Sequence, residues 1–306
     1  MRNITLATLV FAALLAAAPA GAQPAPPLGP DWSKVEVKTT DLGQRTYMLE
    51  GQGGNVTVAL ADDGVIMVDS QFAPMHPKLK AAIGALSPQP IRFLINTHYH
   101  GDHTGGNQAF AGDGVTVVAH KNVREKLAGG FTNGLTGART PGLAEGFHPK
   151  QTYDSAATVI ELKGRKAQLH HPLNAHTDGD TYVYFADANV LATGDTVALG
   201  RYPNIDFANG GTIRGMIAAA DAYLALSNDT TRIVPGHGPL IGKAQLTEYR
   251  AMLATSRDRI ATLAAEGKSE ADVIALRPLA DIDAKLNAND QQRTNWIRVV
   301  YASLKM

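Results

Sequence analysis

Three histidines and one aspartate lie within six consecutive positions of the segment 97–107. Imidazole nitrogens and carboxylate oxygens both bind Zn²⁺, and a cluster this dense disfavours the alternative of an ordinary polar surface loop. The segment directly follows an apolar run, and alternate residues at a strand end point the same way, so His98 and His100 can converge on one ion. Asp102 and His103, beyond the intervening glycine, are free to face a second ion. We therefore predict a metal site here.

Three further donors, His176, Asp195 and His237, each lie beside or near a glycine at the end of a strand-like run. Taken alone, each is weak evidence, because an aspartate after a glycine is more often a turn or a cap than a ligand. Together with the central cluster they supply the donors that a site for two metals still lacks. The chain contains no cysteine, so any metal site must use histidine and carboxylate ligands.

The segments around these donors alternate β-type runs with helical patterns. In the helical segment 77–86, apolar residues recur at positions i, i+3, i+4 and i+7, and Asp62-Asp63-Gly64 is typical of a tight hairpin. Strands interleaved with helices, occurring twice, predict two packed sheets with helices outside them. We expect strands over 46–49, 55–61, 64–68, 91–96, 158–162, 167–170, 181–185, 190–193 and 232–234, and helices over 77–86, 211–226, 247–265 and 291–304.

Charge and composition narrow the class of substrate. The 306 residues include 28 basic and 28 acidic side chains, so the formal net charge is zero. Proteins that bind a polyphosphate backbone usually carry a concentrated basic excess, which argues against a nucleic-acid partner. We expect a small-molecule substrate, and the oligomeric state stays open.

The first residues have the pattern of a cleavable signal peptide. Arg2 precedes an apolar run over 4–18, and an Ala-x-Ala motif ends just before Gln23. A membrane anchor is the alternative, but the run is shorter than the roughly 20 residues that a span requires. We expect a signal peptide over 1–22, a mature N-terminus at Gln23, a periplasmic or secreted protein, and no membrane contact after cleavage. The proline-rich start of 23–40 indicates a leader or linker.

The order of the motifs resembles the metallo-β-lactamase superfamily over residues 41–240. A His-x-His-x-Asp-His motif is followed by a histidine, an aspartate and a histidine, each after a predicted strand. The resemblance implies an α+β fold, an αββα sandwich of two mixed sheets with helices on both outer faces. The fold would occupy 41–243, and the C-terminal helices of 244–306 would pack on the same domain.

The resemblance also implies roles for the donors. It assigns one zinc ion to His98, His100 and His176, the other to Asp102, His103 and His237, and a bridging position to Asp195. Asp69 would support the ligand loop from outside. Asp102 and Asp195 would be catalytic. Two zinc ions would share a hydroxide that attacks a carbonyl carbon, with Asp195 bridging the ions and Asp102 helping to orient the hydroxide.

The implied activity is zinc-dependent hydrolysis of an ester, lactone or β-lactam-like amide. The β-lactamases with these histidines carry Cys or Ser where this chain has Asp195, and a bridging aspartate instead resembles glyoxalase II, lactonases and ribonuclease Z. Ribonuclease Z would need an RNA-binding arm and a basic surface, and the sequence shows neither. The alternatives left open are a thioester hydrolase of the glyoxalase II type and an iron-dependent oxidoreductase of the same superfamily.

Two loops are candidates for the pocket wall. Arg201 or Asn204, in the loop 200–206, is predicted to contact a substrate carboxylate. The alternative, that these polar side chains are simply solvated on a surface loop, explains their presence at least as well. The glycine-rich segment 51–55 is either a mobile flap or a simple turn. The remaining histidines are not expected to be ligands: His76, His120, His148, His170 and His171.

Overall fold

The computed structural model describes residues 30–305. The expected signal peptide, the cleavage before Gln23 and the first part of the expected leader, 23–29, lie outside the described residues. No helix within the described part of the chain combines the length and the apolar character needed to cross a membrane.

The first sheet has seven strands in the order β1-β2-β3-β4-β5-β6-β9. Strands β1 to β4 pair antiparallel, whereas β4, β5, β6 and β9 pair parallel. The β-branched run of β3 is buried along its whole length, and the predicted hairpin turn at Asp62-Asp63-Gly64 connects it to β4. The strands are β1 (Lys38–Asp41), β2 (Thr46–Glu50), β3 (Val56–Leu60), β4 (Val65–Val68), β5 (Ile91–Ile95), β6 (Thr116–His120) and β9 (Gln151–Tyr153).

The second sheet has five strands in the order β10-β11-β12-β13-β14. All of its pairs are antiparallel except β13 with β14, which is parallel. Strand β13 continues well past the predicted end at residue 193, because its pairing with β14 resumes after a register shift at Gly194. The strands are β10 (Ala157–Leu162), β11 (Arg165–His170), β12 (Tyr182–Phe185), β13 (Val190–Ala198) and β14 (Arg232–His237).

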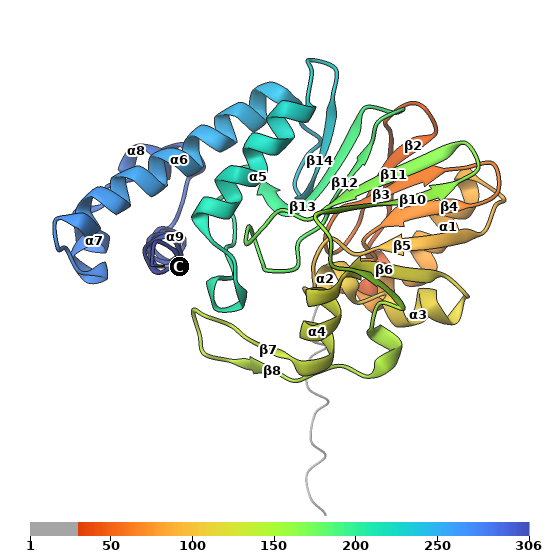
Figure 1. The fold of residues 1–306 in the computed structure, drawn as a ribbon, viewed down its shortest axis with the longest axis horizontal. Helices are drawn as coiled ribbons and strands as arrows, with labels where there is room; N and C mark the ends of the chain where they lie inside the picture. Colours follow the sequence, from red (N-terminus) through yellow and green to blue (C-terminus); the bar gives the residue numbers. More distant parts are fainter. Residues whose placement is uncertain (1–29, 306) are drawn as a thin grey trace, which may run out of the picture.

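Three apolar clusters define four layers (Figure 1). One cluster lies between the sheets and includes Ile66, Ile95, Phe185 and Val190. A second joins the outer face of the first sheet to α1 (His76–Leu86) and α3 (Asn107–Gly112). The third joins the second sheet to α5 (Ile213–Leu226) and α6 (Lys243–Ala265). The predicted αββα sandwich of two mixed sheets is therefore confirmed.

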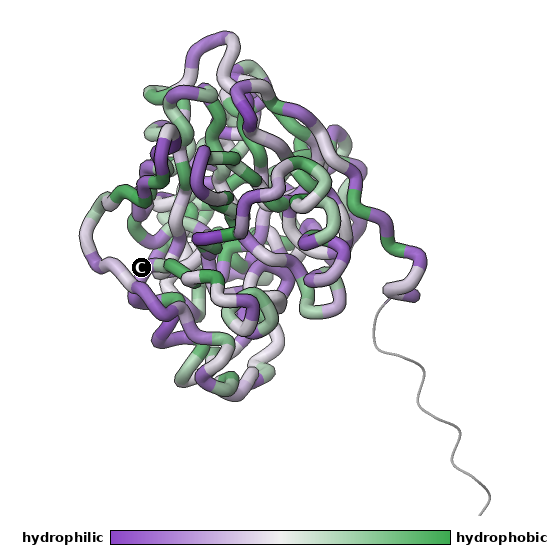
Figure 2. Tube along the Cα trace, turned by 90° about the vertical axis from the view of Figure 1, so that its right-hand side faces the viewer, coloured by the Kyte–Doolittle hydropathy of each residue, from purple (hydrophilic) through white to green (hydrophobic). Residues whose placement is uncertain are grey.

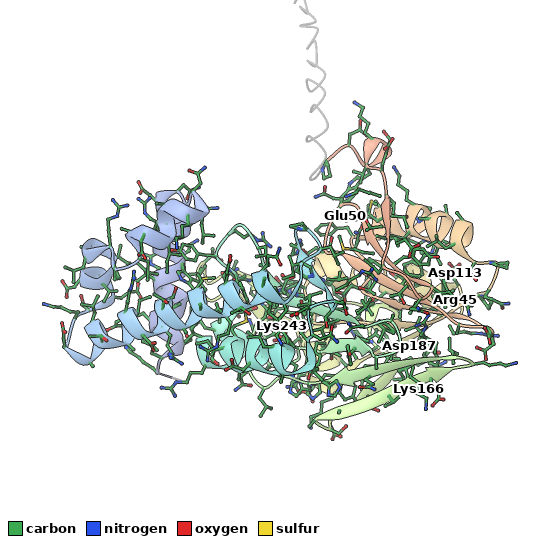
Figure 3. All side chains as sticks on the ribbon, turned by 90° about the horizontal axis from the view of Figure 1, so that it is seen from above. Arg45, Glu50, Asp113, Lys166, Asp187 and Lys243 are labelled. Carbon is green, nitrogen blue, oxygen red and sulfur yellow. The ribbon has the colours of Figure 1, made fainter. Side chains whose placement is uncertain are left out.

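The C-terminal helices pack on the second sheet's side of the same molecule. Leu253, Trp296 and Val300 belong to the cluster that contains α5, and the Trp296 indole donates to Ser256 Oγ over 3.1 Å. Hydrophobic stretches gather inside the molecule (Figure 2), while charged side chains such as Lys166 and Asp187 lie at its periphery (Figure 3). The helices after α6 are α7 (Glu270–Leu276), α8 (Ala280–Leu286) and α9 (Asp290–Ser303).

The linker predicted for 23–40 is wrong in its last part. Lys38–Asp41 forms β1, which pairs antiparallel with β2, and Lys38 Nζ also donates to Glu50 Oε2 over 2.7 Å, while most of its side chains are exposed. Trp32, Val35 and Val37 also pack against the apolar cluster that joins the outer face of the first sheet to α1 and α3. The strand lacks an apolar alternation, so its sequence carries no strand signal.

His120 ends β6 and caps α4 (Lys121–Gly129), as its position in the sequence indicates. Its Nδ1 accepts a hydrogen bond from Asn122 N (3.4 Å), and its ring stacks on that of His171 with 3.8 Å between centroids. Burial, followed by the neighbouring His171, lowers the pKa of His120 to about 4. The fold therefore holds this imidazole neutral.

This neutral imidazole predicts a loss of stability in acid. The unfolded chain takes up a proton near pH 6.5, whereas the folded His120 does so only near pH 4, so stability falls as the pH falls between these values. Wild type should therefore lose free energy of unfolding when the pH is lowered from 7 to 5. The variant His120→Asn keeps a capping acceptor but has no imidazole to protonate, so we expect its loss over the same pH change to be smaller by about 1–2 kcal/mol. Denaturant titrations at both pH values measure this difference. His148→Asn is the control, and an equal loss in wild type and His120→Asn contradicts the explanation.

Candidate metal centre

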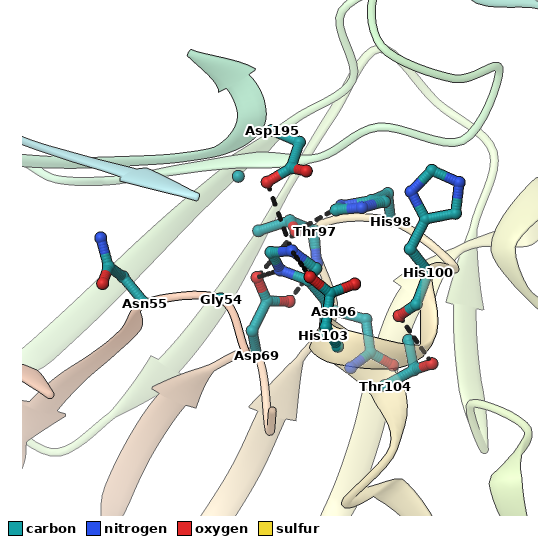
Figure 4. Close-up of polar contacts among 12 residues, drawn as sticks. Gly54, Asn55, Asp69, Asn96, Thr97, His98, His100, His103, Thr104 and Asp195 are labelled. Atoms are coloured by element: carbon teal, nitrogen blue, oxygen red, sulfur yellow. Dashed lines mark hydrogen bonds and ion pairs between the residues drawn. The ribbon is translucent and has the colours of Figure 1, made fainter. Parts of the chain in front are cut away.

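Seven side chains from four segments of the chain converge at one edge of the sandwich. Figure 4 shows four of them, His98, His100, His103 and Asp195. Four come from the segment after β5, which continues into the short helix α2 (Gly101–Thr104). His176 comes from the loop between β11 and β12, Asp195 from β13 and His237 from the end of β14. Their donor atoms form two groups, and within each group all donor atoms lie within 4.8 Å of one another. The first group is His98, His100, His176 and Asp195, and the second group is Asp102, His103 and His237.

In the first group, three imidazoles surround one point. His176 Nε2 lies 3.0 Å from His100 Nδ1, and the His98 ring lies 4.8 Å and 4.6 Å from the His100 and His176 rings. Nitrogens from rings on separate segments, this close together, have the arrangement of ligands around a shared cation.

The second group combines two imidazoles with one carboxylate. His237 Nε2 lies 3.0 Å from Asp102 Oδ2, and His103 Nε2 lies 3.3 Å from His237 Nε2. Burial raises the pKa of Asp102, but the hydrogen bond with His237 and the nearby His103 outweigh it and bring the pKa to about 2. Asp102 is therefore ionised near neutral pH.

Asp195 lies between the groups. Its Oδ1 is 3.2 Å from His103 Nε2 and 3.5 Å from His237 Nε2, whereas its Oδ2 is 3.9 Å from His176 Nε2. Burial raises the pKa of Asp195, but His103 overcomes that effect and holds it well below its usual value. One carboxylate oxygen is thus directed toward each group.

Two glycines allow this close approach. A Cβ at Gly236 would lie 2.0 Å from Asp195 Oδ1, and one at Gly54 would lie 2.2 Å from the His103 ring. Any larger residue at either position would displace a predicted ligand. The segment 51–55 is also held in place, because Gly54 N donates to Asp102 O (3.0 Å) and Asn55 Nδ2 donates to Gly238 O (2.9 Å). These hydrogen bonds tie the segment to the second group of donors.

Hydrogen bonds behind the ligands fix which ring nitrogen faces the centre. The Thr97 hydroxyl donates to Asp69 Oδ2 (2.8 Å), so its oxygen accepts from His98 Nδ1 (3.0 Å). The unprotonated nitrogen of His98 is therefore Nε2, which is buried and has no hydrogen-bond partner among the described residues. Burial also holds the pKa of His98 well below its usual value.

Asp69 contacts the ligand segment from behind, at the position predicted for it. Its carboxylate accepts from Thr97 N and from Thr97 Oγ1, each over 2.8 Å, and from His103 Nδ1 over 2.8 Å. The residue is 1% exposed and has a φ of 65°, a backbone conformation that few residues other than glycine, asparagine and aspartate adopt readily. His103 is thereby oriented with Nε2 toward the second group.

The first group has a carboxylate behind it that the sequence did not indicate. Asp206 Oδ2 accepts from His100 Nε2 (3.2 Å) and from the Tyr99 hydroxyl, and His176 Nδ1 donates to Asn204 O (2.8 Å). Burial raises the pKa of Asp206, but these hydrogen bonds, led by that from His100, lower it below its usual value. Only its membership of the loop 200–206, close after Asp195 in the sequence, pointed to this residue.

These residues fit a metal ion. His98 Nε2 and Asp195 Oδ1 are both buried and lack hydrogen-bond partners among the described residues, which is costly unless a cation completes them. Imidazoles with outward N–H groups bonded to oxygen, together with carboxylates, are the donors that zinc takes in proteins. The remaining histidines, including His76, His148 and His170, belong to neither group.

A cavity of about 310 Å³ opens beside both groups, since His100 and Asp102 each line it. The hairpin of β7 (Phe131–Thr132) and β8 (Arg139–Thr140) and the loop after β13 form its walls. Asn204 lines it as predicted, but Arg201 does not. No Lys or Arg belongs to the described lining: Phe131, Asn133, Gly134, Leu135, Asn204, Ile205, Asp206 and Phe207.

Comparison with known proteins agrees with this geometry. The family model described as the metallo-beta-lactamase superfamily matches residues 49–237. The chain is 29% identical over 168 residues to the 2,4-dinitroanisole O-demethylase subunit alpha of Nocardioides sp. (strain JS1661), covering 54% of this chain and 45% of that protein. It is 33% identical over 150 residues to a hydroxyacylglutathione hydrolase of Nitrosococcus oceani, covering 48% of each chain.

The solved structures agree on the fold. A metallo-beta-lactamase from Pontibacter korlensis superposes with a TM-score of 0.58 at 18% identity, covering 72% of this chain and 99% of that one. The chain spans about half the length of the two curated relatives named above.

Proposed function

Because the chain belongs to the metallo-β-lactamase superfamily, we propose that it is a hydrolase that holds two zinc ions and cleaves an ester, lactone or amide bond. The observation that carries the proposal is Asp195, whose two oxygens are directed toward separate groups of donors. A carboxylate in that position can hold two cations side by side. His98, His100 and His176 would hold one ion, and Asp102, His103 and His237 the other.

When bound, a pair of zinc ions supplies Lewis acidity and lowers the pKa of water to near 7. The chain's own residues then bind and orient the reactants. Asp102 is ionised and its side chain is 28% exposed at the cavity, so it can accept a hydrogen bond from the attacking water. His100, which also lines the cavity, is held in orientation by Asp206. Phe131, Leu135 and Phe207 provide apolar walls that exclude water from the bond being cleaved.

The charges around the site support an uncharged scissile group. Four carboxylates lie within or directly behind the two groups, at Asp69, Asp102, Asp195 and Asp206. Their charge balances that of two divalent ions, and no Lys or Arg lines the described cavity. A carboxylate directly beside the scissile bond, as in a β-lactam, would find no Lys or Arg among the described lining residues and would compete with the reacting groups for the metal ions. Simple esters and lactones are therefore favoured over β-lactams.

A thioester hydrolase is the second candidate. It is favoured by the 33% identity to a hydroxyacylglutathione hydrolase, over about half of each chain. A thioester places its carbonyl before the same donors, and its sulfur leaving group needs no protonation. Zinc-loaded protein assayed on a matched aryl ester, lactone and thioester separates these substrates. Purification with bound iron instead of zinc would favour an oxidoreductase and contradict both proposals.

Asp102→Ala tests the proposed use of two ions. Asp102 is more exposed than the other donors of its group, so its loss should leave the fold intact. We expect zinc content to fall from about two to about one per chain and kcat/KM for an aryl ester to fall by about 10²- to 10³-fold. Metal analysis, kinetics and circular dichroism on the same sample measure this. His148→Ala is the matched control, and wild-type turnover by Asp102→Ala with one zinc would rule out the two-ion proposal.

A further inference from the structure

The loop 200–206 borders three cavities in succession. The first is the metal cavity already described, which Asn204 and Asp206 line. A middle cavity of about 260 Å³ lies between Arg201–Asn204 and the face of α9 that carries Trp296. An outer cavity of about 700 Å³ lies between the start of the loop and helices α6 and α8.

These cavities are adjacent, because neighbouring ones share lining residues. Leu135 and Asn204 line both the metal cavity and the middle cavity. Arg201 lines both the middle cavity and the outer cavity. A molecule that extends from the metal groups past Leu135 therefore reaches Arg201 next.

Contacts at both ends keep the loop in a fixed position. At the metal end, Asn204 O accepts from His176 Nδ1 (2.8 Å) and Asp206 N donates to His176 O (2.9 Å). At the far end, the Tyr202 hydroxyl donates to Asp283 Oδ1 (2.7 Å), and the Tyr202 ring stacks on Trp296 with 5.1 Å between centroids. Arg201 is thus held in a defined place relative to a predicted metal ligand.

Arg201 is the first cation along this path. No Lys or Arg lines the metal cavity, and Arg201 is the one cation among the described residues that line the middle cavity. It forms no hydrogen bond or ion pair with the described residues, whereas Arg259 in the outer cavity is paired with Asp281 over 3.1 Å. A guanidinium without a partner can form a bidentate pair with a carboxylate.

We propose that Arg201 binds the anionic far end of an elongated substrate whose scissile group lies at the metal groups. This inference rests on the proposed hydrolytic function and narrows its substrate class. The substrate is an ester, lactone or amide with a neutral scissile end, an apolar middle part against Leu135 and Trp296, and a carboxylate several bonds away. The cationic contact is separated from the reaction and does not compete with the metal groups for the anion.

Phenyl monoesters of α,ω-dicarboxylic acids of increasing length test the proposal, each compared with the uncharged phenyl alkanoate of equal length. The measured quantity is the ratio of the two kcat/KM values. In wild type the ratio should rise to a maximum at one chain length. At that length Arg201→Gln should lower the ratio by about three- to tenfold, and Arg201→Lys should lower it less. Lys285→Gln, at a cation that lines the outer cavity alone, should leave the ratio unchanged.

A binding measurement on metal-free protein separates this proposal from the hydrolytic one. Trp296 lines the middle cavity and is one of two tryptophans, so its fluorescence can be followed in a Trp32→Phe background. The monomethylamide of the diacid with the optimal length should change that fluorescence, with a Kd about three- to tenfold weaker in Arg201→Gln. If no ester is cleaved by zinc-loaded protein, the hydrolytic proposal fails, and the same titration, run over the diacid series, still decides the role of Arg201. Equal Kd values in wild type and Arg201→Gln, or a loss confined to Lys285→Gln, would overturn the proposal.

Discussion

Asp195→Asn is expected to lower kcat/KM by about 10³-fold or more and to reduce zinc binding below two ions per chain. The reason is that both oxygens of Asp195 are used, one toward His103 and His237 and the other toward His176. An amide keeps the shape but replaces one oxygen with an N–H donor that repels a cation. It also removes a negative charge that lies among several imidazoles. Zinc titration by calorimetry together with aryl-ester kinetics measures both effects.

The matched control is Asp221→Asn, an aspartate on the surface whose carboxylate pairs with Arg250 over 2.7 Å. It should retain zinc binding and turnover, because an exposed pair contributes little. Should Asp195→Asn bind two ions with wild-type affinity, the carboxylate does not bridge them. The assignment of the two groups to a shared centre would then be wrong.

Asp69→Ala is expected to lower the free energy of unfolding by about 3–5 kcal/mol. Asp69 is buried and accepts three hydrogen bonds, so its removal leaves two donors of Thr97 and one of His103 without partners. Alanine also adopts a positive φ less readily than aspartate. With His103 no longer oriented, zinc affinity at the second group should fall by about 10- to 100-fold. Urea unfolding of metal-free protein and zinc titration measure the two effects separately.

Asp69→Asn separates charge from backbone conformation at the same position. Asparagine tolerates the positive φ, so the backbone contribution is retained, while its N–H₂ group faces donors that need acceptors. We expect it to be more stable than Asp69→Ala, yet still weakened in zinc binding. Wild-type stability in both variants would mean that other residues position the ligand segment.

The sequence predicted the elements in which residue type and periodicity agree. The apolar runs of β3 and β5 and the helical spacing of α1 each have a single good solution, and the density of donors after β5 has few explanations other than a metal. Asp69 was located by family resemblance, since an aspartate after a strand has no distinctive local pattern. Its three hydrogen bonds then give the resemblance a physical basis.

The parts that the sequence missed depend on contacts between distant segments. Strand β13 was predicted to stop at residue 193 because Gly-Asp is typical of a turn, whereas Gly194 has a φ of 54° within a continuing strand. Asp206 contacts His100 only because the loop folds back onto the ligands. Arg201 is close to Asp195 in the sequence but lies beyond the metal cavity, since β13 continues to Ala198 before the loop begins.

The division of the donors between two sheets sets an order of events during synthesis. Residues 98–103 leave the ribosome early, but one group lacks His176 and Asp195 and the other lacks His237 until the second sheet has been made. A nascent chain therefore carries both groups of donors in incomplete form. Both groups are complete only when β13 and β14 dock against the first half of the molecule, so full loading of the two proposed metal positions would follow the assembly of the sandwich.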